Sequence, residues 1–516
     1  MKQSTLLPLL SLPFLATSAS AQLVAVTGTD LAAMAATAAD GETIIIQSDD
    51  TFVGTLEWTS KTLTIRAGLG FTPTVKGDPG SAAVNNAGDE MVGIFRDLRF
   101  EPGDPLVVTP AAVSLSGTSG SPEVATLELI DCRVDGRLSV VGTGFLVQTL
   151  TLRGTESSDE LDIGGTGSRE VEVQVLDQSR VRGLDVGPTG NPTIDLLVRD
   201  SRVEGPTEID PVSSSGVTAN FRRARLEGQV SIEGSSSGGV DVITDALLES
   251  CLILGDGTGV GLFTDTRSNV RGVNLTVTGF GTGLETNVGT TLDNLLVYGN
   301  GDDLDDVVLQ FQIANSLIED GTYAGLFGNV AGTPIVDQAY FLYETSPGID
   351  AGDSSVPELD NTDVKGDPRV QDGDGDGNAR VNLGAVESVR PCGAASVAPL
   401  NGSGTNPSDL SVVGAPLVGQ PLNVDITTAP ATVATVVAIG LPSPTPLALP
   451  GFDGELLLAP APSPILDTAL GSHAIQIPGN GNYCGQTIAI QGVRGDVGPG
   501  GVELRFTNGA LLTLGV

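Results

Sequence analysis

Short runs of alternating apolar and polar residues recur along the central part of the chain, and each run ends at a glycine. A repeat of about 23 residues, built from β-branched runs and Gly, Asn and Asp turns, is typical of one coil of a solenoid and too short for a propeller blade. The pattern therefore predicts an all-β chain whose coils stack their strands on one another. The runs end at Gly136, Gly154, Gly183, Gly205, Gly228, Gly255, Gly279, Gly299 and Gly321.

The residue two positions before the glycine is apolar in the four clearest runs, where it is Val134, Val181, Val203 and Leu226. Side chains alternate between the two faces of a strand, so these four are expected to point inward and to stack between coils. Aromatic residues make up only 4% of the chain, so the core must be built from Val, Leu and Ile.

An alanine-rich segment precedes the coils. Thr29 or Asp30 can cap a short helix, Gly41 can end it, and Thr43–Ile46 is predicted as the first strand. An amphipathic helix here would cover the open apolar end of the solenoid, which is otherwise an aggregation-prone edge. We therefore expect an N-terminal capping helix.

This order of helix, glycine and strand closely resembles the opening of right-handed parallel β-helix repeat proteins of the pectin-lyase-like superfamily. The resemblance covers about Thr27–Glu387, and it implies a right-handed parallel β-helix solenoid. Three motifs, Thr345–Asp353, Asp367–Val370 and Val381–Glu387, resemble the closing segment of secreted bacterial β-helix proteins. The family usually has an acidic residue where this chain has Asn382 and an aromatic residue where it has Val386.

The composition changes at Pro391, after which the chain is rich in proline and contains no lysine. Alternating runs such as Leu422–Ile426 and Gly501–Phe506 predict a small β-sandwich-like domain. This part resembles a C-terminal β domain of exported proteins from planctomycete-type bacteria. Cys392 and Cys484 both lie in it and are predicted to form a disulfide, whereas buried free thiols are expected at two positions near the start of strands, Cys132 and Cys251.

The N-terminus has the pattern of a signal peptide. Lys2 precedes the apolar stretch Leu6–Ala16, and Ala19-Ser20-Ala21 predicts cleavage before Gln22. A retained membrane anchor is the weaker alternative, because the stretch is short and contains prolines. The mature chain is expected to have no membrane span and to be secreted or held at the cell surface. Four parts result, namely a signal peptide at 1–21, a β-helix at 22–335, a closing segment at 336–390 and a C-terminal domain at 391–516.

Charge and candidate chemistry narrow the function only partly. The formal net charge of −38 repels phosphate backbones, so nucleic acid is not an expected partner. Asp372, Asp374, Asp376 and Asn378 alternate with glycine like the first half of a calcium loop, although Leu383 stands where a bidentate Glu would complete it. We expect at most a weak Ca²⁺ site there, against a flexible Gly-Asp turn.

Three arginines, Arg180, Arg202 and Arg225, occupy the same position in consecutive coils, with Arg133 in the same column. Two interpretations remain open for this outward row. Acidic residues one position before the glycine, Asp135, Glu204 and Glu227, could neutralise it as an internal ladder. Alternatively, the guanidinium groups could bind the carboxylates or sulfates of an acidic polysaccharide or of the cell envelope.

No catalytic site is recognisable in the sequence. The single histidine, His473, has no partner at motif spacing, and the cluster Asp302–Asp306 is interpreted first as a solvated loop, then as a calcium or acid and base site. The paired Asp, His and Arg-x-Lys motifs of pectin-lyase-like hydrolases are not visible. The sequence favours a non-catalytic β-helix that binds glycans or associates with the envelope, and the alternative is a polysaccharide lyase or glycoside hydrolase.

Overall fold

The computed structural model describes residues 22–86, 91–104, 111–115, 124–143, 147–166, 170–213, 215–237, 240–305, 312–459, 465–478 and 483–515. The predicted signal peptide lies outside these residues. The chain forms two compact units, Met1–Arg182 with Thr189–Thr193, and Gly183–Pro188 with Ile194–Val516. We call them unit 1 and unit 2 and describe each by itself.

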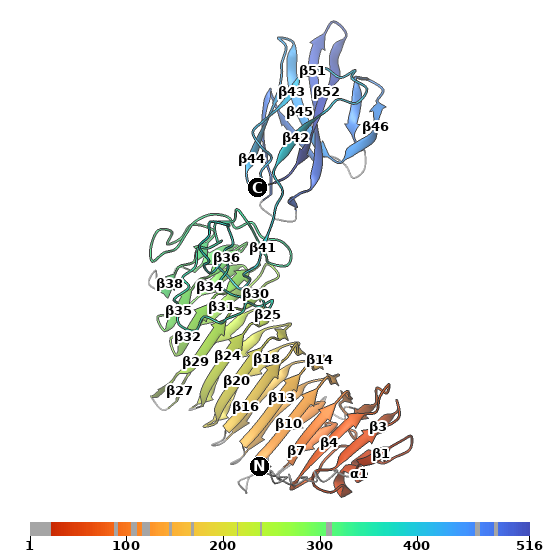
Figure 1. Cartoon of the computed structure of the whole chain (residues 1–516), viewed down its shortest axis with the longest axis vertical. Coiled ribbons are helices and arrows are strands. Elements are labelled where there is room, and N and C mark those ends of the chain that lie inside the picture. The colour runs from red at the N-terminus through yellow and green to blue at the C-terminus, as the bar shows by residue number, and fades with distance from the viewer. Residues whose placement is uncertain are drawn as a thin grey trace, which may run out of the picture. The chain divides into compact units, whose positions relative to one another are not determined.

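Unit 1 is a parallel β-solenoid with three sheets, and Figure 1 shows the strands of its first sheet as a row of parallel arrows. The first sheet contains β1 (Gln22–Ala25), β2 (Thr43–Ile46), β4 (Lys61–Ala67), β7 (Met91–Arg96), β10 (Val124–Ile130), β13 (Val147–Arg153) and β16 (Glu170–Leu176). The second contains β3 (Thr51–Val53), β5 (Thr74–Lys76), β8 (Arg99–Glu101), β11 (Arg133–Val134), β14 (Glu156–Ser157) and β17 (Arg180–Val181). The third contains β6 (Val84–Asn86), β9 (Val113–Leu115), β12 (Leu138–Thr143) and β15 (Leu161–Thr166).

Unit 2 begins with the same three-sheet parallel solenoid. Its first sheet contains β20 (Thr193–Arg199), β24 (Gly216–Arg222), β29 (Thr244–Glu249), β32 (Ser268–Val273), β35 (Thr290–Asp293) and β38 (Ile313–Ala314). The second contains β21 (Arg202–Val203), β25 (Arg225–Glu227), β30 (Leu252–Leu254), β33 (Thr276–Thr278), β36 (Leu296–Tyr298) and β39 (Leu317–Ile318). The third contains β18 (Leu184–Val186), β22 (Thr207–Ile209), β26 (Val230–Ile232), β31 (Val260–Thr264), β34 (Thr282–Glu285) and β37 (Asp302–Leu304).

The coil length and the inward positions agree with the sequence pattern. The register pairs Val124 with Val147 and Val147 with Glu170, a step of 23 residues each time. The four residues two positions before the glycine are all fully buried, in both units. Stacked aliphatic side chains therefore form the core of each solenoid, as predicted.

In the coils from β7 to β38, a residue with a left-handed backbone turns the chain from the first sheet into the second. This residue directly follows the first-sheet strand, and its φ lies between 48° and 58°. Asp and Asn tolerate this conformation better than other residues with a side chain, and Gly adopts it freely. The corner residues are Asp97, Asp131, Gly154 and Asp177 in unit 1, and Asp200, Arg223, Ser250, Asn274, Asn294 and Asn315 in unit 2.

The entry of unit 1 differs in two respects from the prediction, the first being that the helix ends at Thr37 with Ala38 as its C-cap and not at Gly41. Helix α1 (Leu31–Thr37) is present, and Asp30 caps it by accepting a hydrogen bond from the backbone N–H of Ala33 at 2.9 Å. A strand nevertheless precedes the helix, because β1 pairs in parallel with β2. The prediction that Thr43–Ile46 forms the first strand is therefore wrong. Strand β1 has only four residues and directly follows the expected cleavage site. No turn residues separate it from the predicted signal peptide, so the sequence pattern did not indicate a strand there. That α1 covers the end of the solenoid stays a prediction.

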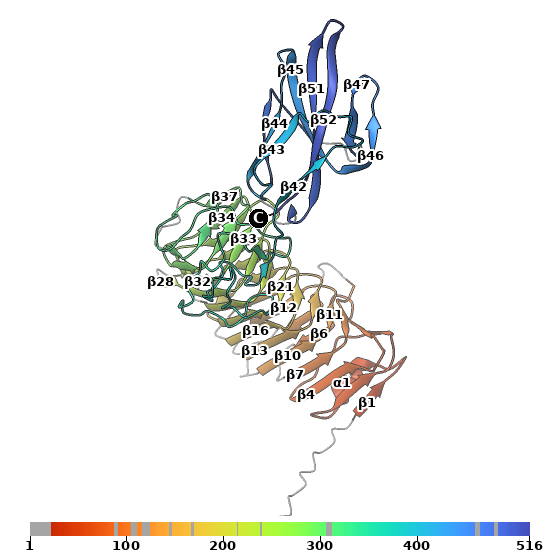
Figure 2. The same cartoon turned by 45° about the horizontal axis from the view of Figure 1, so that its top comes forward.

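The C-terminal strands of unit 2 form an antiparallel sandwich, visible in Figure 2 around β45, β51 and β52. Its core lies between a six-stranded and a three-stranded sheet and includes Leu422, Val437 and Leu512. The larger sheet contains β42 (Ser396–Leu400), β45 (Thr432–Gly440), β47 (Phe452–Asp453), β49 (Ile465–Ala469), β51 (Thr487–Gly498) and β52 (Gly501–Thr513). The smaller contains β43 (Leu410–Val413), β44 (Pro421–Ile426) and β50 (Ser472–Gln476), while β46 (Pro442–Ala448) pairs with β48 (Glu455–Leu458).

The cysteines behave as predicted. A disulfide joins Cys392 to Cys484, whose Cα atoms lie 5.7 Å apart. Cys132 and Cys251 are free and buried, each next to a left-handed corner, and burial raises the pKa of both thiols to about 12. They are therefore packing residues without thiolate chemistry. Among the helices of the described residues, none is long and apolar enough to cross a membrane.

The predicted closing motifs fold back onto the last coils of unit 2 through a buried arginine. Arg369 is 1% exposed, and its Nη2 donates to Ser250 Oγ at 2.7 Å and to the Ala385 carbonyl at 3.1 Å. Its Nη1 donates to Glu387 Oε2 at 3.3 Å. Because Ser250 is a corner residue, this side chain ties the closing segment directly to the solenoid.

Asparagines and a glycine complete the attachment. Asn274, another corner residue, donates from Nδ2 to the carbonyls of Asn382 and Gly384 at 3.2 and 3.3 Å. A Cβ on Gly384, whose φ is +89°, would lie 2.8 Å from Cβ of Leu296, so only glycine allows this approach. Asn382, where the family usually has an acidic residue, is fully buried and donates to the Glu387 carbonyl.

Arg369 should be among the residues on which the stability of unit 2 depends most. Arg369→Met leaves the buried oxygens of Ser250, Ala385 and Glu387 without the guanidinium group that donates to them, so we expect a loss of about 3 to 5 kcal/mol in the free energy of unfolding. Arg380→Met, at an exposed position of the same segment, is the matched control and should change little. Urea unfolding followed by circular dichroism measures both. Equal losses in the two variants would contradict the assignment.

Two buried carboxyl groups should make this stability depend on pH. Burial raises the pKa of Glu249 to about 7, with Asp360 adding to the shift, and raises that of Glu387 to about 8 against the opposing effect of Arg369. Between pH 4.5 and 7 the folded protein thus holds a proton on Glu249 that the unfolded chain has lost. Because the native state binds more protons, its stability decreases as the pH rises through this window.

We expect Glu249→Gln to remove part of this decrease, on the order of 2 to 3 kcal/mol between pH 5 and pH 7. Asp245→Asn, in the same strand but on its outer face, is the control and should leave the pH dependence as in the wild type. Urea midpoints at the two pH values give the comparison. A wild-type protein that becomes more stable from pH 5 to pH 7, by an amount that Glu249→Gln does not alter, would show the assignment of Glu249 to be wrong.

Candidate functional site

The structure brings two of the three predicted arginines together. Arg202 in β21 and Arg225 in β25 are register partners in the second sheet of unit 2. Each is partly exposed, as expected for an outward position beside a buried one. Arg180 begins β17 in unit 1, where it is the register partner of Glu156. Glu156 in turn pairs with Arg133, so it fills the gap that the sequence left in that column.

The acidic residues predicted as internal partners do pair with the arginines. Arg202 contacts Glu204 at 3.0 Å and Glu227 at 2.7 Å, while Arg225 contacts the other oxygen of Glu227 at 2.5 Å. Burial alone would raise the pKa of Glu227, but the hydrogen bonds from the two arginines outweigh burial and lower it. In unit 1, Arg133 contacts Asp135 at 2.9 Å in the same way. The ladder is therefore neutralised from within at these positions.

A groove of about 610 Å³ lies beside the ladder in unit 2. Its walls come from β25 and the end of β30, from the turns that follow β21, β25, β30 and β33, and from one residue of the closing segment. Most of the side chains in it are polar. The groove is defined by Glu204, Arg225, Glu227, Gln229, Asp256 and Tyr340.

Tyr340 is placed in the groove by a turn with an unusual backbone. Its φ is +69°, a conformation that is rare for a residue with a side chain and that marks a locally strained position. Asp337 holds the turn, because its Oδ1 accepts the N–H groups of Ala339 and Phe341 at 2.8 and 2.9 Å. The ring centroid lies 5.6 Å from the Arg225 guanidinium, within the range of a cation–π contact.

The ring of Phe341, the residue after Tyr340, also stabilises this turn. Arg390 lies over the ring of Phe341 at 4.1 Å and also contacts Asp337 at 3.5 Å, while Lys365 lies 5.8 Å from the ring. Desolvation, and after it the charge of Arg225, lower the pKa of Lys365. The turn that carries Tyr340 is therefore held by ionic and aromatic contacts from three other segments.

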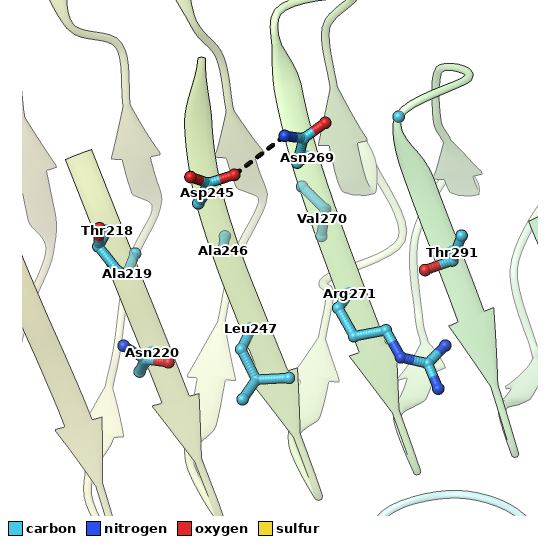
Figure 3. A pocket seen from close by; sticks show the side chains of 11 residues that line it. Thr218, Ala219, Asn220, Asp245, Ala246, Leu247, Asn269, Val270, Arg271 and Thr291 are labelled. Atoms are coloured by element: carbon cyan, nitrogen blue, oxygen red, sulfur yellow. Dashed lines mark hydrogen bonds between the residues drawn. The ribbon is translucent and has the colours of Figure 1, made fainter. Parts of the chain in front are cut away.

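A shallower hollow of about 390 Å³ lies on the outer face of the first sheet of unit 2 (Figure 3). Asp245 accepts a hydrogen bond from Asn269 at 3.0 Å, and Arg271 extends toward β35, where it pairs with Asp293. Of the described residues that line it, Asp245 is the one carboxylate and none is aromatic. The hollow therefore lacks the pair of carboxylates that glycoside hydrolysis requires.

The structure separates the acidic residues that the sequence groups at Asp302–Asp306. Asp303 points inward, where it accepts hydrogen bonds from Asn300 Nδ2 at 3.0 Å and from the N–H of Asp320 at 3.1 Å. Asp302 is exposed, and Asp306 lies outside the described residues. The described carboxylates of this segment do not form a cluster of three or more that could hold a metal ion.

The Gly-Asp loop is closed at its base by a β-bridge between Gln371 and Arg380. Of the four predicted ligands, Asp372 and Asp374 come together, and the carboxylate that joins them is Asp350 from the preceding motif. One ligand atom from each of the three lies within 4.8 Å of the others. Asp376 does not belong to this group of acidic residues, and its Oδ1 accepts the N–H of Asn378.

His473 is a buried residue of strand β50. Its Nδ1 lies 2.8 Å from Asp467 Oδ2, and its Nε2 lies 3.0 Å from Thr435 Oγ1. This chain of contacts resembles a catalytic triad, but Thr435 is 1% exposed and its hydroxyl already donates to the Ala469 carbonyl and accepts from Gly471. The three side chains hold the hairpin of β49 and β50.

No family model, curated protein or solved structure matches the chain. The parallel β-solenoid is shown by the strand pairing itself, whereas membership of the pectin-lyase-like superfamily stays a resemblance. Sequence reasoning identified Arg225 and the internal acids, but it missed Tyr340 and Asp350. Tyr340 has no motif around it, and the signal for Asp350 was its place in the closing motif.

An internally neutralised ladder should bind anionic glycans only after its acids are removed. Glu204→Gln combined with Glu227→Gln frees both guanidinium groups, so we expect roughly tenfold tighter binding to a sulfated glycan at low salt. The wild type should pass through a heparin column with little retention. If the wild type is retained and Arg202→Ala with Arg225→Ala abolishes retention, the arginines are available to ligands and the internal ladder is not their main role.

Proposed function

We propose that this protein is an extracytoplasmic, non-catalytic β-solenoid that binds a neutral glycan chain in the groove beside Tyr340. The observation that carries the proposal is the placement of Tyr340. Its ring is held at the wall of a polar groove by a strained backbone and by a contact with Arg225. The corner residues show that a left-handed backbone can also be purely structural, so the position of the ring at the groove carries the proposal and the strain only adds to it.

The lining of the groove suits a sugar. A tyrosine offers an apolar face that can stack on the C–H groups of a pyranose ring and a hydroxyl group for a polar contact. Glu227, Asp256 and Gln229 supply acceptors and donors for sugar hydroxyl groups at fixed positions. Concave sites with a few fixed polar groups are the usual form of small-molecule binding sites.

Charge favours a neutral glycan over the acidic polysaccharide that the sequence suggested. The groove is lined by three carboxylates, Glu204, Glu227 and Asp256, and by one guanidinium group, Arg225, which Glu227 already binds. A uronate or a sulfate would therefore meet a negative potential there, in a chain whose net charge is −38. An acidic polysaccharide or the cell envelope remains the second candidate partner, through arginines outside this groove.

The pKa shifts in the groove do not favour catalysis. A glycoside hydrolase needs one carboxyl group whose pKa is raised so that it can protonate the leaving oxygen. The hydrogen bonds from Arg202 and Arg225 lower the pKa of Glu227 despite its burial, and those from Thr258 lower the pKa of Asp256. Both carboxyl groups are therefore suited to accept hydrogen bonds, and the lyase or hydrolase alternative has less support.

Export rests on the signal-peptide pattern and agrees with the disulfide between Cys392 and Cys484, because disulfides persist mainly in oxidising compartments. We propose that the mature chain is secreted or held at the cell surface. Detection of the mature protein in the culture medium or on intact cells, with Gln22 at its N-terminus, would test this part.

The groove is tested by a glycan array with the purified mature protein and its Tyr340→Ala variant. We expect binding to a neutral glycan and about tenfold weaker binding by the variant, the loss of one stacking contact. Phe327→Ala is a closely matched control, because Phe327 is an exposed aromatic residue that also has a left-handed backbone, with φ +50°. Tyr340→Phe should keep most of the affinity.

Three results would overturn the proposal. These are binding that Tyr340→Ala and Phe327→Ala weaken equally, binding confined to uronate or sulfated glycans, and new reducing ends or unsaturated uronates in the incubated glycan. The last result would establish the enzyme alternative.

A further inference from the structure

In the cluster of Asp350, Asp372 and Asp374, the carboxylate of Asp350 is buried and only one of its two oxygens accepts hydrogen bonds from the described residues. Asp350 is 9% exposed, and its Oδ2 accepts the N–H groups of Gly373 and Asp374, both at 2.9 Å. Its Oδ1 is buried and accepts no hydrogen bond from any residue that the structure describes. A buried carboxylate oxygen without a donor is costly, and proteins usually compensate such an atom with a cation or a bound water.

The other two carboxylates are held at the same place by the loop itself. Asp372 accepts the N–H groups of Gly375 at 2.8 Å and Gly377 at 3.0 Å, and Asp374 accepts that of Asp376 at 2.9 Å. These contacts bring three negative groups together, with ligand atoms within 4.8 Å of one another. Asp372 and Asp374 are exposed, so an ion can reach the cluster from solvent.

From this geometry we propose that Asp350, Asp372 and Asp374 bind one calcium ion. All three donors are carboxylate oxygens, which hard cations prefer, and no histidine or cysteine belongs to the cluster. Calcium suits a flexible loop site whose other positions are filled by water, whereas magnesium demands a closer and more regular shell. The proposed ligands differ from the sequence prediction, since Asp350 replaces Asp376 and Asn378.

Bound calcium would brace the closing segment of unit 2. The N–H of Asp350 donates to Asn382 Oδ1 at 2.7 Å, and the N–H of Asn382 donates to both oxygens of Glu387, the partner of Arg369. The ion is thus one hydrogen-bonded residue away from the buried attachment of the segment. This inference does not depend on glycan binding in the groove.

Calorimetric titration of the chelator-treated mature protein with calcium tests the site. We expect one site in the range of about 10⁻⁵ to 10⁻³ M in the presence of excess magnesium. Asp350→Asn keeps the shape and an oxygen for Gly373 and Asp374 but removes the charge, and it should weaken calcium binding at least tenfold. Asp374→Asn, at an exposed position, should do the same and is less able to affect folding. Asp376→Asn is the matched control and should change affinity less than twofold.

Limited proteolysis provides a second readout. Arg380 is exposed at the end of the loop, so trypsin should cleave after it several-fold more slowly when calcium is bound. Calcium should not protect Asp350→Asn or Asp374→Asn in this way. The proposal is overturned if the wild type binds no calcium at about 10 mM, or if Asp376→Asn weakens binding as much as Asp350→Asn and Asp374→Asn.

Discussion

The left-handed corner between the first and second sheets is the constraint on which the coils from β7 to β38 depend. In each described coil from β7 to β38 one residue with φ near +50° turns the chain, so that the next residues fall into register with the preceding coil. That register places an aliphatic residue inside and a charged residue beside it outside. These repeated positions give rise to the arginine ladder, to the groove and to the hydrogen bond between Arg369 and Ser250.

The end of the solenoid poses a different problem, because a stack of parallel coils finishes with unpaired polar and apolar edges. In unit 2 the closing segment packs on the last coils and is attached to them by buried hydrogen bonds. Arg369 and Asn274 donate hydrogen bonds to carbonyl groups of the closing segment. Gly384 has no Cβ and therefore allows this segment to lie close to Leu296. The same segment carries Tyr340 and Asp350, so the attachment of the segment also determines where the two proposed binding sites lie.

Much of the fold was predictable because alternation and glycine spacing are local signals. The coil length and the inward Val134 and Val203 follow from them. The pairing of Cys392 with Cys484 was predicted because both lie in the C-terminal domain of a chain expected to be exported. The corners were not recognised, since Asp, Asn, Ser, Arg and Gly share only a backbone angle there. The sequence left the arginine ladder open between two interpretations, and the distances from Arg202 and Arg225 to Glu227 support internal pairing. Tyr340 could not be predicted because its neighbours in the groove lie far away in sequence.

We propose the groove between the coil turns and the Tyr340 turn as the binding surface of unit 2. Hydrogen–deuterium exchange of the mature protein, with and without a glycan that it retains, can locate this surface. We expect slower exchange at 225–229, 254–259 and 337–341, with the outer face of β24, β29 and β32 unchanged. Protection confined to that face or to the C-terminal sandwich, with the groove segments unaffected, would contradict this proposal.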